Sequence, residues 1–363
     1  GAFTVFGIRE SSGLAASGNN ITGNTVTALS SNGNGNAAVI GIETGGGGTT
    51  VQRNTVSGVN ATNTGTFGAY GINVLSGNNS VVKNNFVSDV TGNMQGGAAF
   101  STTFGIFGIR VAAGTGHSVV NNSVNMFGLR AGTATTSLLT AALAVVSTAS
   151  TGLDIRNNIL ANNITGGTTS IANVAIFLPS GGTAAMNLLQ NNNSYYFGTD
   201  VARAGVGQAG TTAGTNFFTT LPALVAYSNT LGNATNDNAS LASTGVVPYT
   251  TSTNLHITGS APEFNTGATI ATVTNDFDGD ARPQSAAYDI GGDEAVVAAC
   301  AGLPSAGTSS ATTPTTVCSN ATVSFTNNAS NVGTGIAYQW QVGAVGGPYT
   351  DVVGGTGATT QIF

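Results

Sequence analysis

A short pattern that recurs along the first 200 residues constrains the fold of this chain more than any other feature. It consists of an apolar residue, two further residues, an asparagine, one residue and a second apolar residue. Its copies occupy residues 21–26, 51–56, 82–87, 119–124 and 155–160, with a weaker copy at 189–194. The asparagines are Asn24, Asn54, Asn85, Asn122, Asn158 and Asn192, at spacings of 30, 31, 37, 36 and 34 residues. A fixed element at such intervals indicates a repeat protein.

A second pattern keeps step with the first at residues 6–9, 40–43, 70–73 and 107–110, where a Gly-Ile pair follows an apolar residue. The apolar residues lie two positions apart, which is the period of a β-strand. The segments between the patterns are rich in Gly, Thr, Ser and Asn and vary in length, as loops do. We expect Phe6, Ile40, Tyr70 and Phe107 to stack in one inward-facing column.

Helical repeats of similar length need a period of 3.6 residues and many helix-forming residues. This chain has 53 glycines and few Glu, Lys or Leu residues, and no signature of a propeller blade is present. Short strands with asparagine at a fixed turn position predict a parallel β-helix. We expect the asparagines to adopt the left-handed conformation at each corner and to form a ladder of amides inside the solenoid.

The repeats over about residues 1–200 resemble those of right-handed parallel β-helix proteins, the fold shared by pectate lyases, polygalacturonases and many adhesins. The resemblance implies the architecture and leaves the activity open, because this fold serves both enzymes and structural proteins.

Residues 201–295 are expected to close the solenoid, starting with a short helix near Thr220. The segments at 254–257, 260–262, 275–283 and 289–294 resemble, in order, the closing segment of many secreted bacterial β-helix proteins. The resemblance places the end of the solenoid near residue 295 and implies a C-terminal cap over the last coil.

Residues 296–316, rich in Ala, Ser, Thr and Pro, are predicted to be a linker. Residues 317–363 carry a cysteine on one predicted strand and Trp340 on the next, which indicates an incomplete Ig-like β-sandwich. The stretch from Cys300 resembles the Ig-like repeats of giant adhesins from Bacteroidetes-type bacteria. Cys300 and Cys318 either pair with each other or with cysteines outside this sequence. The predicted fold class is therefore all-β throughout.

Charge and hydropathy argue against nucleic acid as a partner and against a membrane-spanning segment. The chain has 8 Lys and Arg residues against 14 Asp and Glu residues, with no basic cluster, so we expect no nucleic-acid binding. The sequence contains no run of about 18 consecutive apolar residues, so we expect no membrane-spanning segment. Neither end of the sequence reads like a natural terminus, so we expect the chain to be part of a longer protein.

A carbohydrate-active enzyme on a β-helix scaffold is the main alternative to a structural role. Glycoside hydrolysis needs a pair of carboxyl groups about 5 to 9.5 Å apart. The acids of the coil region fall at different positions within their repeats, so no catalytic residues are assigned; they are Glu10, Glu43, Asp89, Asp154 and Asp200. His117 is expected to be a polar surface residue, and His256 a packing residue.

Arg9, Glu43, Asn73 and Arg110 each follow a Gly-Ile pair. In a β-helix they would form one stripe on an outward face, either as a solvated ladder that fixes the register or as a sugar-binding surface.

Asp276, Asp278 and Asp280 alternate around Gly279, a spacing that resembles the start of a calcium loop. The glutamate that completes such a loop is replaced by Ala287. The two interpretations are a calcium site and an Asx-rich turn in which Arg282 pairs with Asp289 or Asp293. No other cofactor is expected.

The combination of solenoid, Ig-like repeat and low charge predicts a non-catalytic segment of an extracellular adhesin stalk. Its partners would be other modules of the same chain, glycans or cell-surface proteins. The family resemblance implies type IX secretion to the cell surface. An extracellular filament subunit is a third hypothesis, which end-to-end contacts between chains would support.

Overall fold

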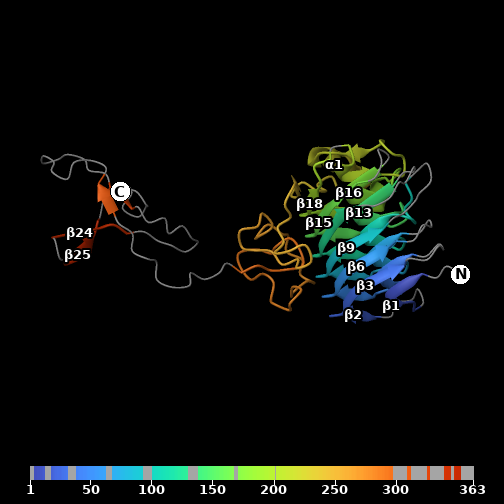
Figure 1. Cartoon of the computed structure of the whole chain (residues 1–363), viewed down its shortest axis with the longest axis horizontal. Helices are drawn as coiled ribbons and strands as arrows, with labels where there is room; N and C mark the ends of the chain where they lie inside the picture. Colours follow the sequence, from blue (N-terminus) through green and yellow to red (C-terminus); the bar gives the residue numbers. More distant parts are fainter. Residues whose placement is uncertain are drawn as a thin grey trace. The chain divides into compact units, whose positions relative to one another are not determined.

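The computed structural model of the chain is an all-β protein built on a parallel β-solenoid (Figure 1). The chain divides into two compact units, Gly1–Val296 and Val297–Phe363. The structure describes residues 4–12, 18–31, 38–62, 68–92, 100–129, 138–166, 171–200 and 202–296 of the first unit. In the second unit it describes residues 309–311, 325–327, 339–344 and 347–352.

Three sheets run along the solenoid, because each coil contributes one strand to each sheet. In the first sheet the strands pair in parallel, and only β20 (Phe217–Phe218) is antiparallel to its neighbour. Its parallel strands are β1 (Val5–Glu10), β4 (Val39–Thr44), β7 (Ala69–Val74), β10 (Ile106–Val111), β13 (Leu138–Val145), β16 (Ile171–Leu178) and β19 (Ala204–Ala209).

The other two sheets contain the strands on either side of the asparagine corner. The second sheet consists of β2 (Asn20–Thr22), β5 (Thr50–Gln52), β8 (Val81–Lys83), β11 (Ser118–Val120), β14 (Asp154–Arg156) and β17 (Leu189–Asn191). The third consists of β3 (Thr25–Ser31), β6 (Thr55–Ala61), β9 (Phe86–Gly92), β12 (Ser123–Leu129), β15 (Ile159–Thr165), β18 (Ser194–Phe197) and β21 (Leu241–Thr244).

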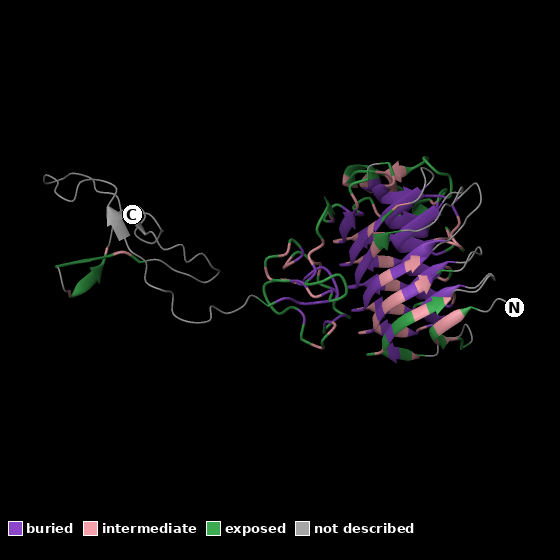
Figure 2. Cartoon of the chain, in the orientation of Figure 1, coloured by how far each residue is buried: buried purple, intermediate pink, exposed green. Residues whose placement is uncertain are grey.

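The core runs along the inside of the coils, where β-branched and leucine side chains lie in register. Ile42 pairs with Ile72, and Ile72 with Ile109, and all three side chains are fully buried. Burial is most complete along the middle strands of the solenoid (Figure 2). Aliphatic residues repeated at one strand position per coil thus build a continuous apolar interior.

The column of Phe6, Ile40, Tyr70 and Phe107 forms in register, but the expectation that it faces inward is wrong. These side chains belong to a second apolar cluster, separate from the main core. Phe100 belongs to the same cluster, so residues that follow the third-sheet strand β9 pack on the first sheet. The first sheet is therefore buried on both faces from β4 to β19, whereas β1 stays partly exposed.

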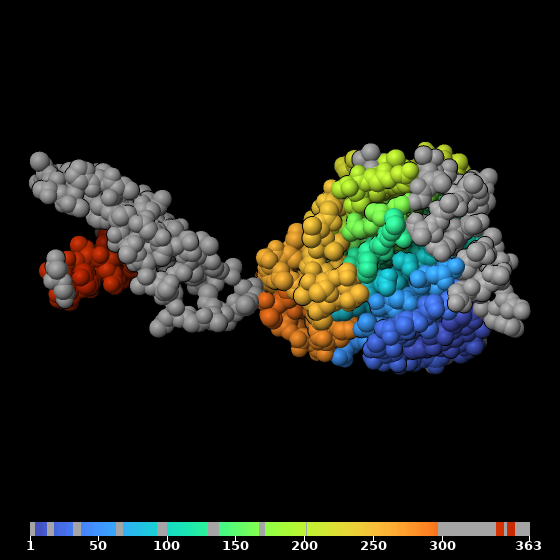
Figure 3. Space-filling model, in the orientation of Figure 1, coloured from blue at the N-terminus to red at the C-terminus, as the bar shows by residue number. Residues whose placement is uncertain are grey.

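The far end of the solenoid is covered by α1 (Leu221–Ser228), together with the short 3-10 helices Ala184–Met186 and Asn229–Leu231. Leu224 and Leu231 are fully buried there. The cap was expected to extend to residue 295, but residues 245–296 do not cover the last coil. They run back along the flank of the solenoid beside β6, β9 and β15, as the orange segment shows (Figures 1 and 3).

In the second unit two small antiparallel pairs are described: β22 (Ser309–Ala311) with β23 (Phe325–Asn327), and β24 (Gln341–Gly343) with β25 (Tyr349–Asp351). Cys300 and Cys318 lie outside the described residues, so their pairing stays a prediction. Across the described residues, no helix has the length and apolar character needed to traverse a membrane.

Candidate functional site

A row of asparagine amides runs through the interior at the corner between the second and third sheets. Asn85 shows the arrangement: its backbone N–H and its Nδ2 both donate to Asn122 Oδ1, at 3.1 and 2.9 Å. The same Nδ2 donates to the carbonyl oxygens of Val51 and Lys83, at 2.9 and 3.0 Å. Each amide thus satisfies buried backbone groups of its own coil and of a neighbouring coil.

This inner row joins six coils and ends at Ser240, whose Oγ accepts from the backbone N–H of Asn193 at 3.0 Å. Its members are Asn24, Asn54, Asn85, Asn122, Asn158 and Asn193. The structure therefore brings together five of the expected asparagines, and the sixth member is Asn193 rather than Asn192. The register explains the difference, because Ile155 pairs with the buried Gln190 and not with Leu189.

The residue before each inner-row asparagine turns the corner. Its φ lies between 51° and 68° in every coil, at Gly23, Arg53, Asn84, Asn121, Asn157 and Asn192. The expectation that the ladder asparagines adopt the left-handed conformation therefore holds for Asn192 but is wrong for the other five, Asn24, Asn54, Asn85, Asn122 and Asn158. Asparagine tolerates this conformation better than most residues, which accounts for the Asn-Asn doublets in four of the six coils.

All of these corner residues except Gly23 form an outer row that holds the flank segment, residues 245–296. Asn157 brackets Ala268, donating from Nδ2 to the carbonyl oxygen at 2.7 Å and accepting the N–H at Oδ1 at 2.8 Å. Asn84 donates to the carbonyl oxygen of Asn275 at 2.6 Å. Further contacts join Asn121 to Asp289 and Gly291, Asn192 to Thr266, and Arg53 to Phe277 and Asp278.

The expected stripe of Arg9, Glu43, Asn73 and Arg110 forms on neighbouring strands but is not a solvated surface. Arg9 Nε lies 3.0 Å from Glu43 Oε1, Asn73 donates to Glu43 at 2.8 Å, and Arg110 donates to Asn73 at 3.0 Å. Arg110 also donates to the carbonyl oxygen of Thr102 at 2.9 Å. Only Arg9 is well exposed, so the stripe is a mostly buried hydrogen-bonded chain.

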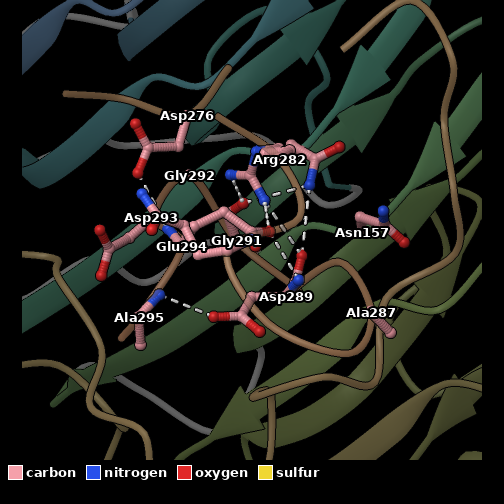
Figure 4. Close-up of polar contacts among 12 residues, drawn as sticks. Asn157, Asp276, Arg282, Ala287, Asp289, Gly291, Gly292, Asp293, Glu294 and Ala295 are labelled. Atoms are coloured by element: carbon pink, nitrogen blue, oxygen red, sulfur yellow. Dashed lines mark hydrogen bonds and ion pairs between the residues drawn. The ribbon is translucent and has the colours of Figure 1, made fainter. Parts of the chain in front are cut away.

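The flank segment contains a buried ion pair between Arg282 and Glu294, with 2.5 Å between Nη1 and Oε1 (Figure 4). Arg282 therefore pairs with Glu294, and not with the carboxylates of Asp289 or Asp293. The Asp289 carboxylate accepts the N–H groups of Asn265 and Ala295, at 2.6 and 2.7 Å. Burial raises the pKa of Asp289 to about 6, although these hydrogen bonds oppose the shift.

Asp276 organises the turn that resembles a calcium loop. Its Oδ1 accepts the N–H groups of Gly279 and Asp280, at 2.9 and 2.8 Å, and its Oδ2 accepts that of Glu294 at 3.1 Å. Both oxygens are thus engaged by backbone donors, as in an Asx-type turn. Asp278 Oδ2 instead lies 2.8 Å from His256 Nε2.

His256, Asp278 and Asp293 form the group of three metal-ligating side chains that converges within the described residues. One ligand atom from each lies within 4.8 Å of the others. Asp293 is buried, and burial raises its pKa to about 6. The expectation that His256 only packs missed this grouping, because Asp278 and Asp293 lie 22 and 37 positions along the chain from it.

Four of the five acids of the coil region have separate partners: Glu10 binds the N–H of Gly46, and Glu43 binds Arg9 and Asn73. Asp154 pairs with Arg156 at 2.7 Å, and Asp200 pairs with Arg203 at 2.5 Å. His117, expected at the surface, is buried. Its Nδ1 accepts the N–H of Ser80 at 3.1 Å, so it supports a loop of the preceding coil.

A hollow of about 260 Å³ lies at the ends of the first-sheet strands β13, β16 and β19. Hydroxyl-bearing side chains dominate its lining, with Val146, Phe177 and Pro179 as apolar neighbours. The hydroxyl groups belong to Thr102, Ser147, Thr148, Ser180 and Thr211. Such a surface can offer hydrogen bonds to a polar ligand but carries no charged group of its own.

Comparison with known proteins found no matching family model, no similar curated protein and no similar solved structure.

Proposed function

We propose that this chain is a non-catalytic segment of an extracellular adhesin stalk, in which a right-handed solenoid acts as a stiff spacer and is followed in the sequence by an Ig-like module. The proposal rests on the different contacts that the inner row and the outer row make. The inner row ties each coil to the next along the axis. The outer row ties the same coils to one flank segment.

The flank segment acts as a brace because its contacts span most of the solenoid. Arg53 holds the carbonyl oxygens of Phe277 and Asp278, and Asn192 holds that of Thr266. To separate any two coils in between, both the axial amide bonds and the lateral contacts must break. In a solenoid each repeat otherwise contacts only its neighbours, so a lateral brace adds resistance to bending and unravelling.

Pulling the chain from its two ends in single-molecule force spectroscopy tests the spacer function. We expect the solenoid to unfold at high force in few steps, and Asn157→Gly, which removes a lateral contact but suits the left-handed backbone, to lower the force. Unravelling coil by coil at low force would contradict the proposal.

The hollow beside Phe177 supports glycan contacts as a second function of the stalk. Its hydroxyl lining suits sugar hydroxyl groups, and the neighbouring aromatic ring is apolar. A glycan array probed with the chain, with Thr148→Val and Ser180→Ala as matched variants, checks this role. Binding that both variants leave unchanged would contradict it.

The enzyme alternative has less support from the geometry. Carboxylates do converge with an arginine at Arg282, but that guanidinium is fully buried, so substrate cannot reach it. Incubating the chain with acidic and neutral polysaccharides, and measuring new reducing ends and unsaturated sugars, tests the alternative directly. Turnover would overturn the non-catalytic assignment.

A further inference from the structure

His256, Asp278 and Asp293 bring three different parts of the flank segment to one place. The side chains of His256 and Asp278 are 34% and 49% exposed, so one side of the group is open to solvent. Asp293 closes the other side and is only 6% exposed. Figure 4 shows the Asp293 carboxylate directed away from Arg282, which is already paired with Glu294.

Within the described part of the chain, only one oxygen of the Asp293 carboxylate accepts a hydrogen bond. Its Oδ2 accepts the N–H of Ile257 at 2.9 Å, whereas Oδ1 accepts no hydrogen bond from the described residues. Oδ1 is not among the fully buried unpaired atoms of the described residues, so it is open to solvent or to a bound cation. Arg53, which lies beside this turn, forms no ion pair with the three side chains; its guanidinium donates to the carbonyl oxygens of Phe277 and Asp278.

The histidine ring is held between two oxygen atoms. Its Nε2 lies 2.8 Å from Asp278 Oδ2, and its Nδ1 contacts Asn254 Oδ1. When Nδ1–H is donated to Asn254, the Nε2 of a neutral ring presents a lone pair to the Asp278 carboxylate. That contact is favourable only when a proton or a cation lies between the two atoms.

We propose that His256 Nε2 and one carboxylate oxygen each from Asp278 and Asp293 bind one divalent transition-metal cation of the zinc class, with solvent completing its coordination. An imidazole with two carboxylates is a ligand set that suits zinc, whereas calcium prefers sites made of oxygen atoms alone. Asp280, part of the spacing that resembles a calcium loop, is not a ligand.

The surroundings of the three side chains match those of metal ligands. Asn254 fixes the ring nitrogen that does not bind metal, and the N–H of Ile257 orients Asp293, as outer partners do in metal sites. The Phe86 ring meets the histidine ring edge to face, with 4.9 Å between centroids. The bound cation would cross-link residues 256, 278 and 293 where they face β9. It would thereby stabilise the folded conformation of the flank segment.

Isothermal titration of the untagged, metal-free full chain with zinc tests the proposal. We expect one zinc ion per chain, with binding lost in both His256→Gln and Asp278→Asn. Both residues are partly exposed, so circular dichroism should show these variants folded. Asp280→Asn, on the same turn, is the matched control and should bind like the parent chain. Unchanged binding by His256→Gln, or no zinc binding by the parent chain, would overturn the site.

Two further measurements separate this site from other sources of binding. A Cys300→Ser/Cys318→Ser variant should keep full affinity; loss of binding would instead assign the metal to the cysteines and overturn the proposal. Asn254→Ala should weaken zinc binding about 10- to 100-fold, because the ring loses the partner that orients it. Calcium in excess should not compete. Competition that disappears in Asp280→Asn would show an oxygen-only calcium site instead.

Discussion

Asn157 and Asn158 are adjacent in the chain, yet their amides serve opposite sides of the backbone. Asn157 brackets Ala268 of the flank segment with two hydrogen bonds, of 2.7 and 2.8 Å. Asn158 donates to Asn193 of the next coil and to the carbonyl oxygen of Val119 in the preceding one, at 3.0 and 2.8 Å. The left-handed backbone conformation at Asn157, with φ of 56°, lets one amide reach the flank segment and the other the neighbouring coils.

Asn158→Ala should lower the free energy of unfolding by about 3 kcal/mol. The substitution leaves the N–H and Nδ2 of Asn122 without their acceptor, and the cost of an unmade buried hydrogen bond is about 1 to 3 kcal/mol. Urea unfolding followed by circular dichroism measures the change. A loss below about 1 kcal/mol would mean that water replaces the amide at little cost.

Asn157→Gly should affect the flank segment rather than the coils. Glycine accepts the left-handed conformation, so only the two contacts with Ala268 are lost. We expect faster hydrogen exchange and faster proteolysis over residues 245–296, with protection of the coil strands retained. Equal loss of protection in β14 and β15 would contradict the separate roles of the two rows.

The coils could be predicted from the sequence because one residue type recurs at one strand position, as Asn54 and Asn85 do. The side of the backbone that each asparagine serves could not, since the doublet Asn84–Asn85 offers two amides with identical chemistry. The doublet itself was the available signal for the outer row. The metal-ligating group escaped detection because His256, Asp278 and Asp293 meet only through the course of the flank segment.

The stripe of Arg9, Glu43, Asn73 and Arg110 shows a second feature that could not be predicted from the sequence, namely its burial. The positions of Glu43 and Asn73 follow from strand alternation, but burial of the sheet's outer face depends on loops of variable length. The same limit applies to the column of Tyr70 and Phe107, because the glycine that follows each of them takes the core-facing position: a Cβ at Gly71 would meet Val87 and Val90. Periodicity predicts which residues align, and packing by distant segments decides which aligned face is buried.

Gly71→Ala should destabilise the solenoid by about 1 to 3 kcal/mol, as overpacking of a filled core does. A Cβ atom there would lie 2.4 Å from Val87 Cγ1 and 2.5 Å from the carbonyl oxygen of Gly108. Gly198→Ala is the matched control, since its nearest neighbour would be 3.5 Å away. Thermal melting of both variants checks the pair, and equal melting temperatures would refute the packing argument.

Arg282→Met should cost about 3 to 5 kcal/mol, because it leaves the Glu294 carboxylate buried without its counter-charge. The double variant Arg282→Met/Glu294→Gln should lose less than the sum of the two single losses. Arg156→Met is the control, since its pair with Asp154 is partly exposed and should contribute about 1 kcal/mol or less. Denaturant unfolding of the parent chain, Arg282→Met, Glu294→Gln and the double variant yields the coupling free energy; a value near zero would contradict the pairing.

Glu10 should make the first coils sensitive to acid. Burial pushes the pKa of its carboxyl upward, but hydrogen bonds from Ser12, Gly46 and Thr44 outweigh burial and lower the pKa from 4.5 to about 2. Since the folded pKa lies below the unfolded value, the stabilisation is complete above pH 4.5 and is lost as the pH falls towards 2.

The comparison of the parent chain with Glu10→Gln isolates this contribution. Asp289 and Asp293, with pKa values raised to about 6, act in the opposite direction: their contribution to stability falls as the pH rises from 3.8 to 6. Because both chains contain these aspartates, the effect cancels in the difference. We expect Glu10→Gln to be less stable at pH 6 and the gap in unfolding free energy to narrow steadily between pH 4.5 and 2. A gap that stays constant over that range would show that the Glu10 carboxylate is not what the loop around Gly46 binds.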